Sequence, residues 1–339
     1  MRQPWIHKPL TDGVFILAPA FFVSLLVIIF HDTFRVIEDQ YSFYTWLFLI
    51  VFIDVAHVYA TLFKTYFVPE AFKARRTLLL VLPLVCFLIG MLLFSFGSTV
   101  FWSCLAYIAV FHFIRQQYGF MRLYSRLEVK TKWSVFFDNL FIYTATVYPM
   151  LYWFLSSPRA FTWFTEHDFF RVENSFALEV LGWIYGFVLL FYVLRTAFQT
   201  YQQKFFNLPK NAIIVGTFLS WYLGIVHYNN DLIFTLLNVV AHGIPYMALI
   251  YLNEIHLKKS RGSGIVAFVK GGKGWLVFIG VLVLIAFSEE YLWEVLVWQE
   301  HFSSPSLDMA QWQIIIVPLL TVPQFTHYLL DGFIWKSNK

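Results

Sequence analysis

Four histidines of the sequence lie inside long hydrophobic segments, where an imidazole is well suited to chemistry. They are His57, His112, His242 and His327. Each has a polar residue three or four positions away. Taken in the same order as the histidines, these neighbours are Asp54, Gln116, Asn238 and Asp331. Residues at this spacing share one face of a helix, so the polar neighbour can orient the imidazole or join it as a ligand.

Imidazole and carboxylate together form the ligand set expected of non-haem iron, and they also bind zinc. The sequence therefore predicts a metal site whose ligands or ligand-orienting groups are His57, His112, His242, His327, Asp54 and Asp331. We expect one or two non-haem iron ions as the cofactor, with zinc as the alternative. The predicted catalytic residues are Asp54, Asp331 and Arg115. Glu254 and His256 could form a second metal position at the cytoplasmic rim of the membrane-spanning region.

The four histidines are also expected at a similar depth in a membrane. Counted from the polar or basic end of each hydrophobic segment, they lie ~10 to ~18 Å inward at about 1.5 Å per residue. A single buried histidine is more commonly a hydrogen-bonded packing residue than a ligand. Four at matched depth, two of them beside carboxylates, favour a functional site, because a carboxylate there costs ~2.5–3.5 kcal/mol on insertion scales.

Composition places these segments in a membrane protein. The 339-residue chain is 59% hydrophobic and 13% charged, with a mean hydropathy of +0.65, whereas a soluble domain is ~25% charged. The net charge of +4 comes from basic residues in short loops, which positive-inside bias explains without a nucleic-acid partner. Cys86 and Cys104 lie in hydrophobic segments without a CxxC pair, so neither a disulfide framework nor a thiolate zinc site is expected.

Ten hydrophobic segments approach the ~20 residues that a helix needs to cross a bilayer. Their approximate bounds are Gly13–Phe30, Phe43–Phe63, Leu78–Phe96, Thr99–Gly119, Val135–Leu155, Phe176–Arg195, Ala212–His227, Leu232–Asn253, Gly274–Val297 and Gln311–Gly332. With both termini in the cytoplasm, every basic loop falls on the cytoplasmic side. The sequence thus predicts an all-α, polytopic transmembrane helix bundle, a single integral membrane domain over residues 1–339, in a bacterial inner membrane or the endoplasmic reticulum.

Three local features bear on the surroundings of the site. Gly243 and Pro245, directly after His242, predict a kink whose freed carbonyls face a cavity. The basic loop Lys258–Lys273 lacks the spacing of a phosphate loop and is expected to meet anionic lipid head groups. Lys64 and Arg115 are expected to reach the membrane interface or to hold an anionic head group.

The arrangement of isolated histidines on several hydrophobic segments resembles that of polytopic, histidine-rich non-haem iron enzymes of membranes, such as lipid desaturases and hydroxylases and carotenoid-cleaving oxygenases. The resemblance implies a metal held within the membrane. The HxxxH and HxxHH boxes of the desaturase and hydroxylase families are absent, so no catalytic residue of those families has a counterpart here.

The leading hypothesis is a membrane-embedded, metal-dependent oxidoreductase that acts on a membrane lipid or isoprenoid and receives electrons from a soluble cytoplasmic reductase. A second hypothesis is an acyl or head-group transferase with His242 as general base. The chain is similar to membrane-bound O-acyltransferases in its number of spans and in Asn211, which precedes His242 by 31 residues. A bis-histidine haem b electron carrier and a transporter with Asp54 and Asp331 as ion sites are further alternatives.

Overall fold

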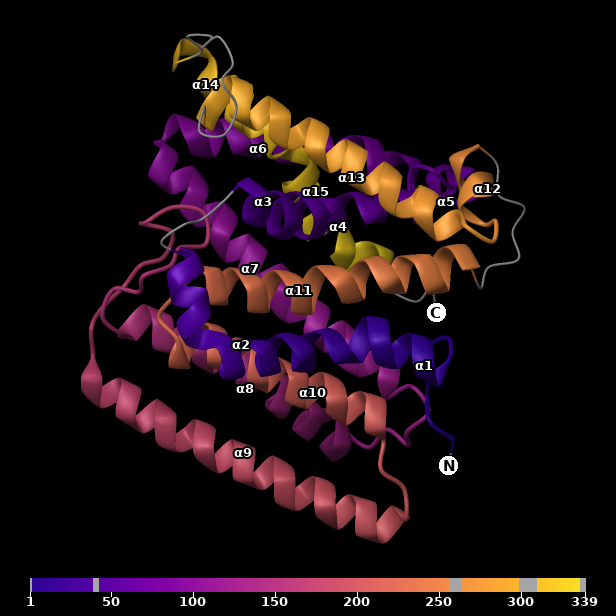
Figure 1. Cartoon of the computed structure of the whole chain (residues 1–339), viewed down its shortest axis with the longest axis vertical. Coiled ribbons are helices and arrows are strands. Elements are labelled where there is room, and N and C mark those ends of the chain that lie inside the picture. The colour runs from indigo at the N-terminus through magenta and orange to yellow at the C-terminus, as the bar shows by residue number, and fades with distance from the viewer. Residues whose placement is uncertain (1, 39–42, 257–263, 299–309, 336–339) are drawn as a thin grey trace. The chain divides into compact units, whose positions relative to one another are not determined.

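The computed structural model describes residues 2–38, 43–256, 264–298 and 310–335 (Figure 1). Helix accounts for 82% of the structure, and the described residues contain no strand. The all-α prediction is therefore confirmed. Residues 258–263 of the loop predicted to meet lipid head groups lie outside the described residues.

Within the described residues, seven helices are long and apolar enough to cross a membrane, which is consistent with a multi-pass membrane protein. They are Pro9–Ile37, Phe43–Phe63, Arg76–Ser95, Ser98–Tyr124, Ser175–Gln203, Asp231–Ile255 and Gly274–Trp298. The bent pair Gln313–Leu320 and Val322–Ile334 counts as an eighth if it is one span. Helix also covers the two remaining predicted spans, as α8 (Lys132–Leu155) and as α10 (Leu208–Trp221) with the π-helix η4 (Tyr222–His227). The number of ten membrane spans stays a prediction.

The packing of the chain divides it into two compact units. The first comprises Met1–Gln40, Phe113–Thr162 and Phe169–His242, and the second comprises Tyr41–His112, Trp163–Asp168 and Gly243–Lys339. Two long helices, α7 (Ser98–Tyr124) and α11 (Asp231–Leu249), contribute residues to both units. The single membrane domain expected over residues 1–339 stays a prediction.

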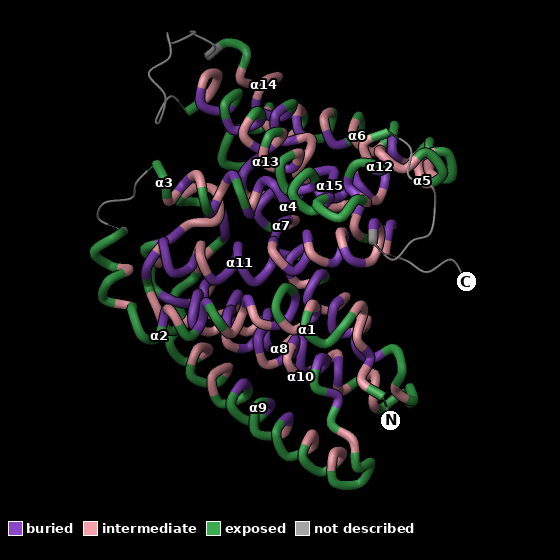
Figure 2. The backbone as a smooth tube through the Cα atoms, turned by 45° about the vertical axis from the view of Figure 1, so that its right-hand side comes forward, coloured by how far each residue is buried: buried purple, intermediate pink, exposed green. Residues whose placement is uncertain are grey.

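The first unit is built around α10 and α8. It also contains α1 (Pro9–Asp12), the π-helix η1 (Gly13–Leu17), α2 (Ala18–Glu38) and α9 (Ser175–Gln203). Helix α10 packs against α2 and α8, and α8 packs in turn against α9 (Figure 1). Most of α9 is exposed (Figure 2), with only Tyr185, Val188 and Tyr192 buried among its residues. Its outward face therefore meets lipid if the unit lies in a membrane.

The second unit contains the remaining helices. They are α3 (Phe43–Trp46), η2 (Leu47–Val55), α4 (Ala56–Ala60), η3 (Thr61–Phe63), α5 (Pro69–Ala74), α6 (Arg76–Ser95), η5 (Ile250–His256), α12 (Ile265–Val269), α13 (Gly274–Trp293), η6 (Glu294–Trp298), η7 (Ala310–Trp312), α14 (Gln313–Leu320) and α15 (Val322–Ile334). Helix α13 packs against η2 and α4, whereas α15 packs against α4 and α6. An apolar cluster that includes Phe101, Trp102, Trp293 and Phe325 fills the space between α6, α7, α13 and α15.

Irregular segments interrupt the helices of the second unit. η2 and η5 are π-helices, a form that often occurs at functional sites. Between α14 and α15 the chain bends by 43° at Thr321, where Pro323 in the first turn of α15 cannot donate a backbone hydrogen bond. Helix α11 continues through Gly243 and Pro245, and the kink expected there stays a prediction.

Candidate metal centre

Three helices of the second unit supply the side chains of the candidate metal centre. Asp54 lies near the end of η2, and His57 follows in α4. His112 comes from α7, while His327 and Asp331 lie one turn apart on α15. The bend at Thr321 lies six residues before His327. The sequence could not place these helices side by side, and the structure does so.

The donor atoms of His112, His327 and Asp331 converge. Each of the three offers a ligand atom, and these atoms all lie within 4.8 Å of one another. His112 Nδ1 is 3.8 Å from Asp331 Oδ2, and the ring centroids of His112 and His327 are 4.6 Å apart. His112 and His327 are 3% and 2% exposed. Two imidazoles and a carboxylate in so dry an environment form a ligand set for a transition metal.

A chain of hydrogen bonds connects two of these ligands. Thr61 Oγ1 lies 2.8 Å from His327 Nδ1 and 2.9 Å from Tyr246 Oη, and Tyr246 Oη donates to Asp331 Oδ1 over 2.7 Å. Since the Tyr246 proton points to the carboxylate, its oxygen accepts the Thr61 proton. The Thr61 oxygen must then accept from His327, so the His327 proton lies on Nδ1.

This tautomer leaves the lone pair of His327 Nε2 available. Nε2 is buried and has no hydrogen-bond partner among the residues that the structure describes. An unsatisfied buried polar atom calls for an explanation, and an ion bound there would supply one. The hydrogen bond to the other ring nitrogen is the orienting contact that metal-binding histidines typically make.

His57 and Asp54 lie beside this group. The His57 ring is 5.1 Å from that of His327 between centroids, and it is 1% exposed. Its Nδ1 atom is 3.7 Å from Asp54 Oδ1, across the expected helical spacing of three residues. The structure thus brings five of the predicted site residues together in one unit: Asp54, His57, His112, His327 and Asp331.

His242 belongs to the first unit, where its ring stacks on Phe113 with 3.6 Å between centroids. The polar neighbours predicted to orient the histidines have other partners. Gln116 Nε2 donates to the backbone oxygen of His242 over 2.9 Å, and Asn238 Nδ2 donates to that of Phe234 over 3.1 Å. A ligand role for His242 stays a prediction.

Arg115 also belongs to the first unit and is exposed. Its guanidinium donates to Tyr143 Oη over 2.5 Å and lies 4.4 Å from the centroid of the Tyr118 ring. Arg115 is therefore a surface residue whose guanidinium is held by two tyrosine side chains. Its predicted catalytic role stays a prediction.

Lys64 has an acidic partner within the second unit. Its Nζ atom is 2.6 Å from Glu254 Oε1 and 3.7 Å from the centroid of the Trp335 ring. Glu254 thus neutralises the charge of Lys64 without an anionic head group. The same Glu254 carboxylate was predicted to bind a second metal. The side chain of His256 lies outside the described part of the chain.

A buried carboxylate of the second unit was not among the predicted site residues. Glu289 is 6% exposed within α13 and accepts hydrogen bonds from Tyr59, from Trp293 Nε1 at 3.4 Å and from Gln324 Nε2 at 3.3 Å. The spacing of four residues between Glu289 and Trp293 was a signal that could have placed both on one buried face.

The transferase alternative relied on Asn211 together with His242. In the first unit, Asn211 Oδ1 accepts from Tyr192 Oη over 2.7 Å, and Asn211 Nδ2 donates to the Asn207 backbone oxygen over 2.7 Å. Both atoms of the amide are thus engaged by structural partners. The geometry gives Asn211 a role in holding α9 and α10 together.

Comparison of the chain with models of protein families, with curated proteins and with solved structures finds no match in any of the three. The function is therefore argued from the geometry of the site.

Proposed function

We propose that the chain is a membrane-embedded, metal-dependent oxidoreductase of the oxygenase, desaturase or hydroxylase type, acting on a lipid-soluble substrate. The observation that carries the proposal is the buried group of His112, His327 and Asp331, whose donor atoms converge. Within the described residues, His327 Nε2 has no hydrogen-bond partner and is left for an ion. Non-haem iron suits this mixture of imidazole and carboxylate, and zinc is the alternative. Iron rather than zinc would supply redox chemistry with dioxygen when bound.

The protein's own residues hold the ligands and fix their protonation. The Tyr246 hydroxyl donates to Asp331 and fixes the position of its carboxyl group, and Thr61 keeps the proton of His327 on Nδ1. His57 closes the site next to His327, with Asp54 to orient it. Burial excludes water from the histidines, so competing hydrolysis and proton leakage are suppressed.

The location of the site indicates the class of substrate. Its helices are candidate membrane spans, so a substrate reaches it most directly from the bilayer, as a lipid or an isoprenoid. Hydroxylation of a C–H bond by dioxygen places one oxygen atom in the product and the other in water, and it consumes two electrons and two protons. A soluble reductase on the cytoplasmic side is the electron donor that we infer.

The test is metal analysis of detergent-purified protein together with its visible spectrum. We expect stoichiometric iron in the wild type and loss of the metal in His327→Ala and His327→Gln. The glutamine variant keeps an amide that can donate to Thr61, so its loss of metal would not arise from a cavity. Thermal unfolding should show that both variants remain folded.

His227→Ala is the matched control, because His227 is an exposed histidine of the first unit. It should retain the metal content of the wild type. Unchanged metal in both folded His327 variants would refute the metal centre. A Soret band would instead identify a haem protein, and activity that survives a chelator without any metal would favour transfer chemistry.

A further inference from the structure

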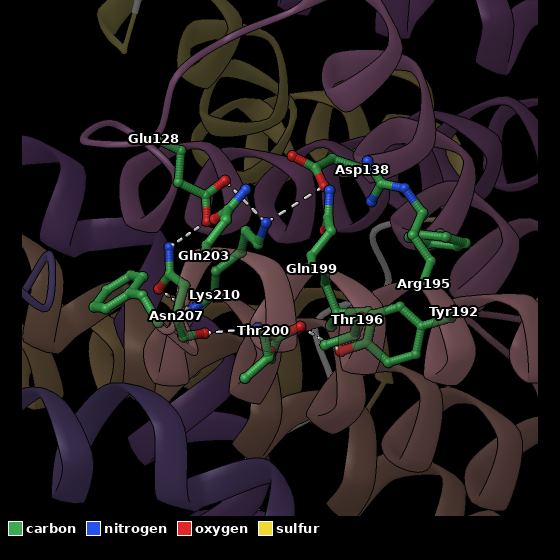
Figure 3. A pocket seen from close by; sticks show the side chains of 14 residues that line it. Glu128, Asp138, Tyr192, Arg195, Thr196, Gln199, Thr200, Gln203, Asn207 and Lys210 are labelled. Carbon is green, nitrogen blue, oxygen red and sulfur yellow. Dashed lines mark hydrogen bonds and ion pairs between the residues drawn. The ribbon is translucent and has the colours of Figure 1, made fainter. Parts of the chain in front are cut away.

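Two adjoining hollows in the first unit are lined by residues of α9. A polar pocket of about 30 Å³ is lined by α9, α8 and α10 residues that include Arg195, Gln199 and Lys210 (Figure 3). An open groove of about 730 Å³ is lined mainly by apolar residues such as Phe21, Val193 and Ala212. Tyr192, Thr196, Thr200 and Asn211 line both hollows, so the two are neighbours.

The charges around the polar pocket leave one cation in excess. Lys210 Nζ is 2.9 Å from Glu128 Oε2 and 3.5 Å from Asp138 Oδ1, and Arg122 Nη1 is 3.7 Å from Asp138 Oδ2. Two carboxylates are thereby compensated by two cations. Arg195 is the additional positive charge.

The guanidinium of Arg195 makes no hydrogen bond or ion pair within the part of the chain that the structure describes. It lies 4.7 Å from the centroid of the Phe137 ring and near Asp138, whose carboxylate is engaged by Lys210 and Arg122 (Figure 3). Arg195 lies within a candidate membrane span, where an arginine is expected to find a partner. A guanidinium on an aromatic face is well placed to bind a phosphate with two parallel hydrogen bonds.

Helix α9 adds neutral hydrogen-bonding groups in line with this arginine. Gln199 and Gln203 follow Arg195 at intervals of four residues, so the three share one face of the helix, and all three line the polar pocket (Figure 3). Their amides can donate to further phosphate or ester oxygens. The pocket therefore presents hydrogen-bond donors to a phosphate group at its opening, near the end of α9 where the basic Lys204 also lies.

The groove is suited to the hydrocarbon part of the same ligand. Its volume lies in the range of ~300–1,000 Å³ typical of pockets for small molecules. Because it is open and lined by apolar side chains of a candidate membrane span, an acyl chain can enter it from the bilayer without crossing water.

We propose that the first unit binds a membrane phospholipid, with its phosphate on Arg195 and Gln199 and an acyl chain in the groove between α9, α10 and α2. This site is separate from the candidate metal centre, which lies in the second unit. The proposal does not depend on the oxidoreductase function. It differs from general lipid contact, because it requires one charged residue at a defined position.

Native mass spectrometry of the detergent-purified full chain tests the proposal. The wild type is expected to retain one phospholipid after delipidating detergent washes. Arg195→Gln should weaken retention by about tenfold or more, as expected for the loss of a charge-assisted hydrogen-bonded pair. Arg195→Lys keeps the charge without the bidentate geometry and should retain an intermediate amount. Ala197→Trp fills the groove at an exposed position and should also release the lipid.

Arg35→Gln is the matched control, because Arg35 is an exposed arginine on α2 that lines neither hollow. It should retain lipid as the wild type does. Equal retention by Arg195→Gln and Arg35→Gln, or no retained phospholipid in the wild type, would overturn the proposal. If Arg195→Gln does not fold, wild-type retention by both Arg195→Lys and Ala197→Trp would overturn it. Inorganic phosphate binding that Ala197→Trp leaves unchanged, without any lipid, would show a phosphate site only.

Discussion

At the scale of single residues, the hydroxyl of Thr61 has the largest consequence for the candidate metal centre. It contacts His327 on one side and Tyr246 on the other, and Tyr246 in turn holds Asp331. The position of each proton in this series of hydrogen bonds therefore depends on the position of the next one. Thr61 is not a metal ligand in this arrangement but a residue that positions two of them.

Thr61→Val should weaken metal binding by about 10–100-fold, the usual cost of losing a contact that orients a ligand. Valine has nearly the same shape as threonine but leaves His327 Nδ1 and the Tyr246 oxygen without their partner. The unfolding free energy should also fall by about 1–3 kcal/mol, because buried polar atoms lose a hydrogen bond. A metal titration and a thermal melt measure the two effects.

Thr61→Ser is the control, since it keeps the hydroxyl. It should bind metal close to the wild-type level. If the valine variant bound metal as tightly as the serine variant, the hydrogen-bond chain would have no influence on His327, and the assigned tautomer would be wrong.

Residue patterns predicted part of this site. The pairs Asp54–His57 and His327–Asp331 were recognised because their members are near in sequence and share a helix face. Thr61 and Glu289 were not, since their partners are distant in the chain: Thr61 bonds His327 across 266 positions, and Glu289 bonds Tyr59 across 230. Such contacts depend on tertiary packing, which local spacing does not encode.

At the scale of elements, the close approach of two helices determines where His57 lies. A Cβ atom added at Gly243 of α11 would be 2.9 Å from Ile53 Cγ2, 3.1 Å from the Ile53 backbone oxygen and 3.5 Å from His57 Cβ. The sequence suggested that this glycine bends its helix. The structure shows a different role for it, because the absence of a side chain lets η2 and α4 approach at short range.

Gly243→Ala should therefore destabilise the second unit by about 1–3 kcal/mol, the typical cost of overpacking. The added methyl group must displace either the β-branched side chain of Ile53 or the backbone that carries His57, so metal binding should weaken as well. Thermal unfolding and a metal titration of the same preparation measure both.

Gly280→Ala provides the comparison within the same unit. Gly280 lies in α13, and a Cβ atom there would meet nothing within 4 Å. Alanine should be neutral or slightly stabilising at this helical position. Equal melting temperatures for the two alanine variants would show that the approach at Gly243 is not tight.

At the scale of the whole molecule, the helices were predictable but their number of crossings was not. Hydrophobic length identified the long helices but not the short α5 and α12, since about 20 apolar residues leave few alternatives in a bilayer. Helix α10 has 14 residues before it widens into η4, and α8 carries the buried Asp138. Length and hydropathy alone therefore do not decide whether these two segments cross the membrane.

The orientation of α9 distinguishes ten spans from eight. If α8 and α10 both cross, the end of α9 near Lys204 and Lys210 is cytoplasmic, as positive-inside bias favours; if neither crosses, α9 is inverted. In a Cys104→Ser background, we expect Glu173→Cys to react with a membrane-impermeant maleimide in intact cells and Gln202→Cys to react only after permeabilisation. Both positions are exposed, whereas Cys86 is buried. The reverse pattern would establish the inverted α9 and refute ten spans, because the basic end would then lie outside.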